Sequence, residues 1–271
     1  ETEIEMSIKG FYRDDFWPLD NEDKTDNFIY RETPSEIIKG TFNGQSGDVT
    51  TLWANQYKSI ARANTILANM DKAASMGISE VKLKQYEAEA LSQRASCYAR
   101  LVTYFGDVVY VTSVVDIEEA FTLGRTPKSE IVPKIYEDYD KAAEGLPEKY
   151  TGVSSLRATK GAALALKARF ALYMGDWEIA ADAAKKCMDL GLYKLHADYA
   201  ELFLTTTKNS EESIFLLPRS IEYKVTLGNW TVMNEVSRNP GGWGAFAPSW
   251  DLLAAYECID GLPIDESPLF D

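Results

Sequence analysis

The feature that most constrains the fold of this chain is a pair of helical patterns separated by a single glycine. Residues 163–191 read ALALKARFALYMGDWEIAADAAKKCMDLG, and apolar residues recur there at the three- and four-residue spacing of an α-helix. Gly175 interrupts the pattern, because glycine readily adopts the left-handed conformation that ends a helix. The second helix begins at Trp177, whose ring we expect to wedge between the two helices. Such a pair buries its apolar faces by stacking against further pairs.

The same spacing predicts further helices before and after this pair. They cover residues 51–76, 80–105 and 129–146, and a short helix follows Pro248. The helix of residues 159–174 is rich in alanine, so its neighbours can approach closely, and we expect it to be central. Helix pairs with a glycine–aspartate–aromatic turn resemble the tetratricopeptide repeat. The sequence therefore predicts an all-α fold of tetratricopeptide-like helical repeats with irregular, loop-rich insertions.

Changes in composition divide the chain into three predicted parts. Residues 1–50 are polar and rich in turns, and we expect an extended loop there with short helical pieces. Residues 51–190 form the repeat scaffold. Residues 191–271 begin a loop-rich ligand-binding region, in which helical periodicity fades. Two runs of β-branched or apolar residues, 108–115 and 212–218, are predicted to be strand-like.

The charge of the chain argues against nucleic acid as a partner. The formal net charge is −14 and the isoelectric point is near 4.7. Because phosphates repel such a surface, we exclude nucleic acid as the ligand.

No apolar run reaches the roughly 18 residues that a membrane-spanning helix needs. The three cysteines lie far apart in sequence and are interpreted as small buried apolar side chains rather than as disulfide partners.

The sequence lacks the common motifs of enzyme active sites. It contains neither the GxSxG elbow of hydrolases nor a GxxxxGK[ST] phosphate loop, and its one histidine, His196, rules out a HExxH zinc site. His196 is interpreted as a surface or capping residue. If the acidic run 20–26 began a calcium loop, Thr25 and Arg31 would stand where that loop needs glycine and glutamate, which leaves only an irregular calcium site open. We therefore predict no catalytic residue, no metal ligand and no cofactor.

Aromatic residues and amides gather in the glycine-rich stretch of residues 219–246. An aromatic ring can pack on the C–H face of a sugar, while amides bond its hydroxyls. The candidate ligand-binding residues are Trp230, Trp243, Tyr223, Asn229, Phe246 and, from an earlier glycine-rich loop, Asn43. Packing of the long loop onto the scaffold is the alternative role for these aromatic residues. Trp250, on a predicted helix, is assigned to the core, and Trp17 and Trp53 are assigned structural roles.

Five segments, taken in order, carry a family resemblance. They read LWANQYKSIARANTIL, YEAEALSQRASCYARLVTYFGDVVYV, RTPKSEIVPKIYEDYDKAAEGLP, RATKGAALALKARFALYMGDW and PSWDLLAAYECIDGLPI. The first contains the pair Ala63-Asn64, and the second ends its helix at Phe105. Together they resemble the SusD/RagB family of glycan-binding lipoproteins of Bacteroidetes, and they cover roughly its N-terminal half. The chain departs from the family pattern at Val109, where most members have proline.

The resemblance implies a function without covalent chemistry. Family members face outward on the outer membrane, capture oligosaccharides and deliver them to a SusC-like TonB-dependent transporter. Membrane association would come only through an N-terminal lipid anchor that is absent from this chain. We therefore expect a cell-surface glycan-binding protein that is not an enzyme. A peptide-binding, tetratricopeptide-like uptake protein is the alternative, and a carbohydrate-cleaving enzyme is a third hypothesis.

Overall fold

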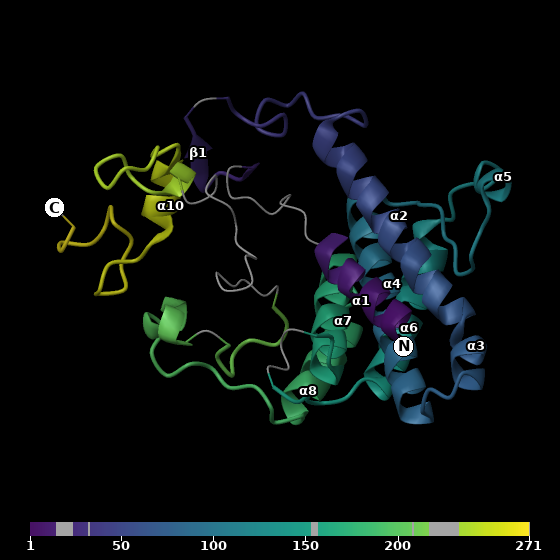
Figure 1. The fold of residues 1–271 in the computed structure, drawn as a ribbon. Coiled ribbons are helices and arrows are strands. Elements are labelled where there is room, and N and C mark those ends of the chain that lie inside the picture. Colours follow the sequence, from purple (N-terminus) through teal and green to yellow (C-terminus); the bar gives the residue numbers. More distant parts are fainter. Residues whose placement is uncertain (15–23, 32, 153–156, 208, 217–232, 271) are drawn as a thin grey trace. The chain divides into compact units, whose positions relative to one another are not determined.

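The computed structural model describes residues 1–14, 24–31, 33–152, 157–207, 209–216 and 233–270 (Figure 1). These residues are mostly helical and contain one two-stranded antiparallel sheet. The chain divides into two compact units, each assembled from two separate segments. Glu1–Phe16 and Trp53–Leu217 form the helical unit, and Trp17–Leu52 and Pro218–Asp271 form the smaller unit. The three-part domain division made from the sequence stays a prediction.

Consecutive helices pack against one another in the helical unit. α4 packs against α6, α6 against α7 and α7 against α8, as in stacked helical repeats. The predicted all-α, repeat-like fold is confirmed. Among the described helices, none combines the length and the apolar character needed to cross a membrane. The bounds are α1 (Thr2–Asp14), α2 (Gly47–Ala68), α3 (Met70–Ser75), α4 (Glu80–Phe105), α5 (Ile117–Ala120), α6 (Lys128–Gly145), α7 (Lys160–Met174), α8 (Trp177–Asp189), η4 (Glu201–Phe203) and η5 (Thr205–Thr207).

Local sequence signals account for the ends of these helices. The Thr159 hydroxyl caps α7 by accepting a hydrogen bond, at 3.1 Å, from the backbone N–H three residues further on. Gly175 ends α7 in the left-handed conformation at φ +81°, and Gly106 ends α4 at φ +69°. The expected wedge at Trp177 is wrong: 66% of this residue is exposed, because the buried face of α8 begins only at Ala180.

The core of the helical unit is centred on α4. This helix contributes 14 buried residues, compared with 7 from α7, which contacts α4, α6 and α8 as expected for a central alanine-rich helix. Full burial of a large apolar side chain stabilises a fold by about 1.5–3 kcal/mol relative to exposure. The largest fully buried side chains of this core include Tyr98, Leu101, Ile131, Ile135 and Tyr139.

Helix α1 replaces the loop expected at the start of the chain. Ile4 and Ile8 lie four residues apart on one face of α1. They pack against a small cluster on α2 and α4 that consists of Ala63, Ile66, Tyr86 and Ala90. Glu3 and Glu5 in the first turn favour a helix N-terminus by their charge. The expectation of only short helical pieces in residues 1–50 is therefore wrong for this segment. The apolar periodicity of the helix consists of one isoleucine pair, which is too little to predict a helix from the sequence.

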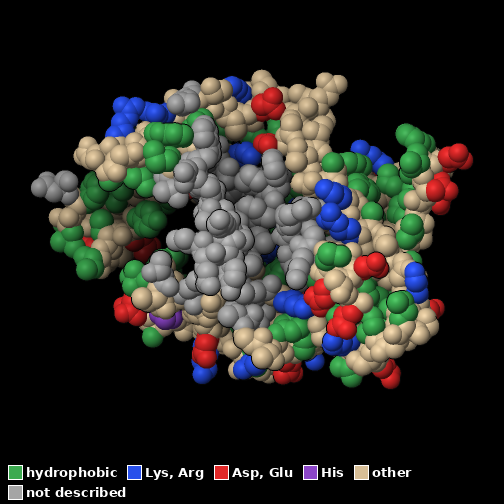
Figure 2. Space-filling model, in the orientation of Figure 1, with side chains coloured by type: hydrophobic (Ala, Val, Ile, Leu, Met, Phe, Trp, Pro, Cys, Tyr) green, Lys and Arg blue, Asp and Glu red, His purple; other side chains and the backbone are tan. Residues whose placement is uncertain are grey.

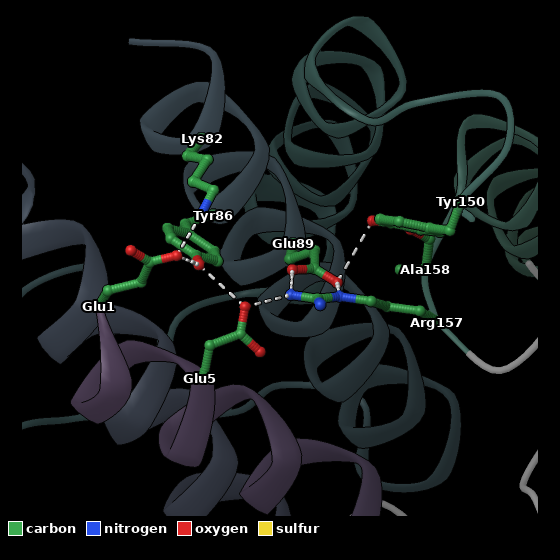
Figure 3. A network of polar contacts seen from close by, with 8 residues as sticks. All are labelled: Glu1, Glu5, Lys82, Tyr86, Glu89, Tyr150, Arg157 and Ala158. Atoms are coloured by element: carbon green, nitrogen blue, oxygen red, sulfur yellow. Dashed lines mark hydrogen bonds and ion pairs between the residues drawn. The ribbon is translucent and has the colours of Figure 1, made fainter. Parts of the chain in front are cut away.

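Arg157 links α1 to α4 through hydrogen bonds and ion pairs (Figure 3). Arg157 Nε and Nη2 donate to the two carboxylate oxygens of Glu89 on α4, at 2.6 and 2.7 Å. Nη2 also donates to Glu5 on α1, at 3.1 Å. The Glu89 side chain is completely buried. Hydrogen bonds to Glu89 raise the pKa of Arg157, although burial acts in the opposite direction. The Arg157 guanidinium therefore keeps its charge inside the fold.

Neighbouring side chains extend this network (Figure 3). The Tyr86 hydroxyl donates to the carboxylate of Glu5 at 2.9 Å, and Lys82 pairs with Glu1. The guanidinium of the central arginine lies 5.4 Å from the centroid of the Tyr150 ring, as a cation–π contact. α1 is thus joined to α4 by polar contacts on one side and by apolar packing on the other.

A second buried ion pair joins α4 to α6. Arg94 Nε and Nη2 donate to the two carboxylate oxygens of Asp138, at 2.8 and 2.9 Å, and Nη1 donates to the amide oxygen of Asn64 at 3.2 Å. Less than a tenth of either charged side chain is exposed. Burial alone would lower the pKa of Arg94, but the hydrogen bonds and the charge of Asp138 outweigh burial and raise it. The same guanidinium therefore orients the Asn64 amide of α2.

Residues 108–115 are extended but do not form the predicted strand. One isolated bridge, between Val108 and Thr126, is the only strand-like pairing of this described segment. Side chains take the place of a neighbouring strand, because buried backbone carbonyls need hydrogen-bond donors. The oriented Asn64 amide donates to the carbonyls of Val111 and Ser113, at 3.0 Å each.

Two tyrosines complete this attachment. Tyr57 of α2 donates to the carbonyl of Val109 at 2.8 Å. Tyr98 of α4 donates to the carbonyl of Val111 at 2.9 Å and accepts a hydrogen bond from its N–H at 2.7 Å. The extended segment is therefore held by side chains of α2 and α4.

Alkaline pH is expected to destabilise the helical unit through two half-buried tyrosines, Tyr57 on α2 and Tyr110 in the extended segment. Burial raises the pKa of Tyr57 and of Tyr110 from 10.0 to about 12. Since the folded pKa lies above the unfolded value, the neutral hydroxyl favours the fold. This contribution is complete below pH 10 and is lost as the pH rises towards about 12. Guanidinium unfolding at stepped pH measures the loss. Tyr57→Phe, which cannot ionise, should show a shallower decline than the wild type, and an equal decline would contradict the prediction.

Candidate functional site

The smaller unit joins two short strands from distant parts of the chain. β1 (Phe28–Tyr30) pairs antiparallel with β2 (Phe246–Pro248). In this register Tyr30 lies opposite Phe246, so the two side chains are cross-strand neighbours. A backbone hydrogen bond from Arg31 to the carbonyl of Ala245, at 2.9 Å, extends the ladder by one residue.

Ser249 fixes the end of this sheet. Its hydroxyl donates to the carbonyl of Asp26 at 2.5 Å and accepts from the N–H of Leu252 at 3.1 Å, which caps α10 (Trp250–Ala255). The short helix predicted after Pro248 is α10, which has six residues. The assignment of Trp250 to the core is wrong, because 80% of the residue is exposed. A helix of this length has too few turns to bury an apolar face, and none of its residues is buried.

The chain just before β2 folds back on itself through glycines. The N–H of Gly242 donates to the carbonyl of Ser237 at 3.0 Å, and the N–H of Gly244 donates to the carbonyl of Val236 at 2.9 Å. A Cβ on Gly242 would lie 2.0 Å from the Val236 carbonyl oxygen, so a larger residue does not fit. The glycine-rich stretch is therefore a compact loop, and it carries Trp243 between the two glycines.

Trp243, Phe246 and Tyr30 form the aromatic part of the candidate site. The Tyr30 and Phe246 ring centroids lie 5.0 Å apart, with their planes inclined by 39°. Trp243 is 39% exposed, and the other two residues are half-buried. A half-buried ring can pack one part of its surface within the protein and offer another part to the C–H face of a sugar. Two of the aromatic residues singled out in the sequence thus belong to one segment, residues 243–246.

The sequence alone does not single out Tyr30. It ends a three-residue strand whose partner lies more than two hundred residues further along the chain. The apolar run FIY is too short to indicate a strand by its periodicity. Only the pairing with β2 brings Tyr30 to Phe246.

Asn43 lies exposed in a loop of the same unit. Its Oδ1 accepts a hydrogen bond from the N–H of Gln45 at 2.9 Å, and its Nδ2 donates to the carbonyl of Thr41 at 3.1 Å. Local bonds of this kind are typical of an Asx turn. Because an amide has two protons and two lone pairs, half of its hydrogen-bonding capacity is left for a ligand. The ligand-binding role of Asn43 stays a prediction.

Several sequence-based expectations fall wholly or partly outside the described residues. Tyr223, Asn229 and Trp230 lie outside them, as does Trp17. Residues 212–216 form turns and bends rather than the predicted strand, and the remainder of that run is not described. The structural assignment of Trp53 is confirmed, because its ring packs edge-on against Phe105, with centroids 5.1 Å apart.

Residues with metal-binding or redox chemistry are dispersed. Within the described ranges, no group of three or more His, Cys, Asp and Glu side chains is arranged to hold a metal ion. His196 is partly exposed, and its Nε2 lies 3.8 Å from a Glu201 carboxylate oxygen. Cys97 and Cys187 are buried thiols, as expected, whereas Cys258 is only partly buried.

The helical unit also contains an open pocket of 710 Å³ between the start of α6 and the turn from α7 to α8. Its size lies within the range of about 300–1,000 Å³ that is usual for ligand pockets. The Tyr136 hydroxyl donates to Asp176 at 2.5 Å, and Asp107 accepts a hydrogen bond from the N–H of Lys128 at 2.8 Å. The apolar lining residues are Pro127, Val132, Pro133, Met174 and Ile179, and the polar ones are Asp107, Lys128, Ser129, Tyr136 and Asp176.

Comparisons with known proteins agree with this architecture. The sequence matches the SusD-like family model described as "Starch-binding associating with outer membrane" over residues 17–172. A SusD-like protein of Formosa agariphila is 28% identical over 173 residues, which cover 64% of this chain and 32% of the relative. The crystal structure of a SusD-like carbohydrate-binding protein of Bacteroides fragilis is 26% identical, with a TM-score of 0.85 over 100% of this chain and 56% of that one. A structure named as a laminarin-binding SusD-like protein is 23% identical, with a TM-score of 0.69 over 79% of this chain and 50% of that one.

The fold and the candidate site define a tetratricopeptide-like helical protein with a loop-rich smaller unit. The chain belongs to the SusD-like family, because the family model matches more than half of its length. The membership predicted from the five sequence segments is confirmed. The chain spans about a third of the length of the Formosa relative and about half of the length of the solved structures.

Proposed function

We propose that this chain captures oligosaccharides non-covalently, as the binding component of a glycan-uptake system, and performs no catalysis. The observation that carries the proposal is the half-exposed Trp243 on a compact glycine loop, directly before the strand that pairs Phe246 with Tyr30. The family description as starch-binding and the carbohydrate-binding name of the Bacteroides fragilis relative support the same class of ligand.

The proposed site combines aromatic stacking with amide hydrogen bonds. Trp243, Phe246 and Tyr30 would supply flat apolar surfaces, and the Asn43 amide would bond hydroxyl groups. Tyr223, Asn229 and Trp230, the remaining residues singled out from the sequence, are proposed to belong to the same site. Stacking surfaces suit a shallow site that takes several sugar units of a chain, because each ring contacts one sugar.

We further propose that the protein acts at the cell surface, anchored to the outer membrane by a lipid. There it would deliver its ligand to a SusC-like TonB-dependent transporter. The family description as associating with the outer membrane supports this location. The net charge of −14 is consistent with a non-phosphate ligand such as a neutral glycan.

Isothermal titration calorimetry with malto-oligosaccharides and laminari-oligosaccharides tests the glycan proposal. Trp243→Ala is expected to weaken the Kd for the preferred glycan by about tenfold or more, because a stacking surface is lost. Trp250→Ala is the matched control, since it removes a more exposed tryptophan of the same unit that lies outside the aromatic group. An unchanged Kd for Trp243→Ala would refute the site, and cleavage products in the same samples would refute the non-catalytic role.

Peptide uptake is the second candidate, and the pocket on α6 favours it. Its apolar lining residues would take apolar side chains of a peptide, and its polar ones, which include Asp107, Lys128 and Asp176, would bond to polar groups of the peptide. Peptide binding in the absence of any oligosaccharide binding would support this alternative.

A further inference from the structure

The projection that carries α5 exposes a group of apolar side chains. We define the α5 projection as residues 114–124. Val114 is 57% exposed, Ile117 77% and Phe121 88%. Figure 1 shows α5 standing apart from the long helices, and Figure 2 shows hydrophobic and acidic side chains together at its place. Single exposed apolar residues are common on protein surfaces, but a group within eight residues is typical of an interaction site.

The base of this projection is held firmly at both ends. On the incoming side, residues 109–113 are attached by hydrogen bonds from α2 and α4. On the outgoing side, Arg125 Nη1 donates to the carbonyl of Asp107 at 2.9 Å, and its guanidinium lies 5.4 Å from the centroid of the Trp53 ring. Thr126 forms the bridge to Val108. The fold therefore orders a loop whose tip buries no large apolar side chain.

The tip itself has a defined local structure. The Asp116 carboxylate accepts a hydrogen bond from the N–H of Glu119 at 2.8 Å and caps α5. Ile117 and Phe121 are four residues apart, the spacing at which helical side chains lie on one face. A surface that is ordered before binding loses less conformational entropy when a partner docks.

The charges around the tip indicate what kind of partner fits. Asp116, Glu118 and Glu119 alternate with the apolar residues, and within the described part of the chain none of the three forms an ion pair. Carboxylates beside an apolar contact favour a partner with cationic side chains around its pocket. A second copy of this chain, with its own charge of −14, is electrostatically disfavoured, as are anionic lipid headgroups.

We propose that the α5 projection docks into an apolar socket, bordered by Lys and Arg side chains, on a partner protein. The inference rests on the proposed function, which supplies the partner to be tested, the SusC-like transporter. Ile117 and Phe121 fill the socket, and the three carboxylates lie at its rim. None of these residues belongs to the aromatic group proposed to bind glycan.

The experiment uses the complete protein and a SusC-like transporter from the same source, purified in detergent. The test variant is Ile117→Ser with Phe121→Ser. The control variant is Leu195→Ser with Phe203→Ser, which removes the same classes of side chain from exposed positions elsewhere on the helical unit. Biolayer interferometry gives the Kd for the transporter, calorimetry gives the Kd for the glycan, and thermal unfolding gives the Tm. A third variant, Glu118→Lys with Glu119→Lys, tests the charged rim.

The test variant is expected to bind the transporter about tenfold or more weakly, with its Tm and glycan Kd unchanged. The charge variant should associate more slowly, and the control should behave as the wild type. Equal transporter binding by all variants would overturn the inference and leave the proposed function standing. A lowered Tm would show that the two side chains pack within the protein itself, which also overturns it. The inference would also be overturned if the wild type formed a dimer that the test variant does not form, because the projection would then bind a second copy of this chain. If the wild type does not bind the transporter, delivery fails as a proposal and this inference fails with it.

Discussion

Replacing Arg94 by methionine is expected to lower the free energy of unfolding by about 3–5 kcal/mol. The substitution keeps an apolar chain of similar length but leaves Asp138 without its cation. Because less than a tenth of the Asp138 side chain is exposed, solvent cannot replace the two lost hydrogen bonds. Asn64 would also lose the donor that orients its amide towards residues 111 and 113.

Guanidinium unfolding measures this effect, and two further variants show its origin. Lys185→Met removes one member of an exposed ion pair with Asp189 and should leave stability nearly unchanged. Arg94→Met combined with Asp138→Leu removes both charges together and should regain most of the loss, because no buried charge is left alone. If the double variant were as unstable as Arg94→Met alone, the effect would come from packing and not from the unpaired carboxylate.

Replacing Arg157 by methionine is expected to cost about 3 kcal/mol of unfolding free energy. Glu89 would stay in a completely buried position without its cation and without its two hydrogen bonds from the guanidinium. The expected loss is placed at the lower end of the range because about a quarter of the Arg157 side chain is exposed, and water can enter there. The bond to Glu5 is lost as well, so α1 should detach more readily.

Two measurements separate these consequences of Arg157→Met. Chemical unfolding gives the global stability, and limited proteolysis gives the rate of cleavage within α1. Lys82→Met is the matched control for α1, because its pair with Glu1 is about half exposed. Arg157→Met with Glu89→Leu should recover global stability but not the protection of α1, since the bond to Glu5 is still missing. An unchanged cleavage rate of α1 in Arg157→Met would contradict the proposal that Arg157 holds α1 against α4.

The repeat scaffold was predictable because its information is local. Spacing of apolar residues and glycine stops fix the long helices, and Gly106, Thr159 and Gly175 fall at helix ends in the sequence and in the structure. Such signals act within one or two turns of the chain, so they can be read without knowing the fold.

Other features depend on residues that are far apart. Nothing near Tyr30 in the sequence indicates that it faces Phe246. The β-branched run from Val108 has the composition of a strand, but the structure shows that side chains, and not a neighbouring strand, bond its backbone. Trp250 shows the opposite error, because its place on a predicted helix indicated burial, although that helix is too short to bury a face. The family resemblance supplied the class of ligand, whereas the loop geometry around Trp243 came only from the structure.

The pairing of β1 with β2 also bears on the order in which the molecule forms. The hydrogen bond from Ser249 to Asp26 spans 223 positions along the chain. During synthesis from the N-terminus, β1 therefore emerges long before its partner, and the whole helical unit is completed in the interval. Since non-local contacts form after local ones, the helices are expected to assemble first and the small sheet to close last. A strand of three residues exposes few unpaired backbone groups, which limits wrong pairing with other chains during that wait.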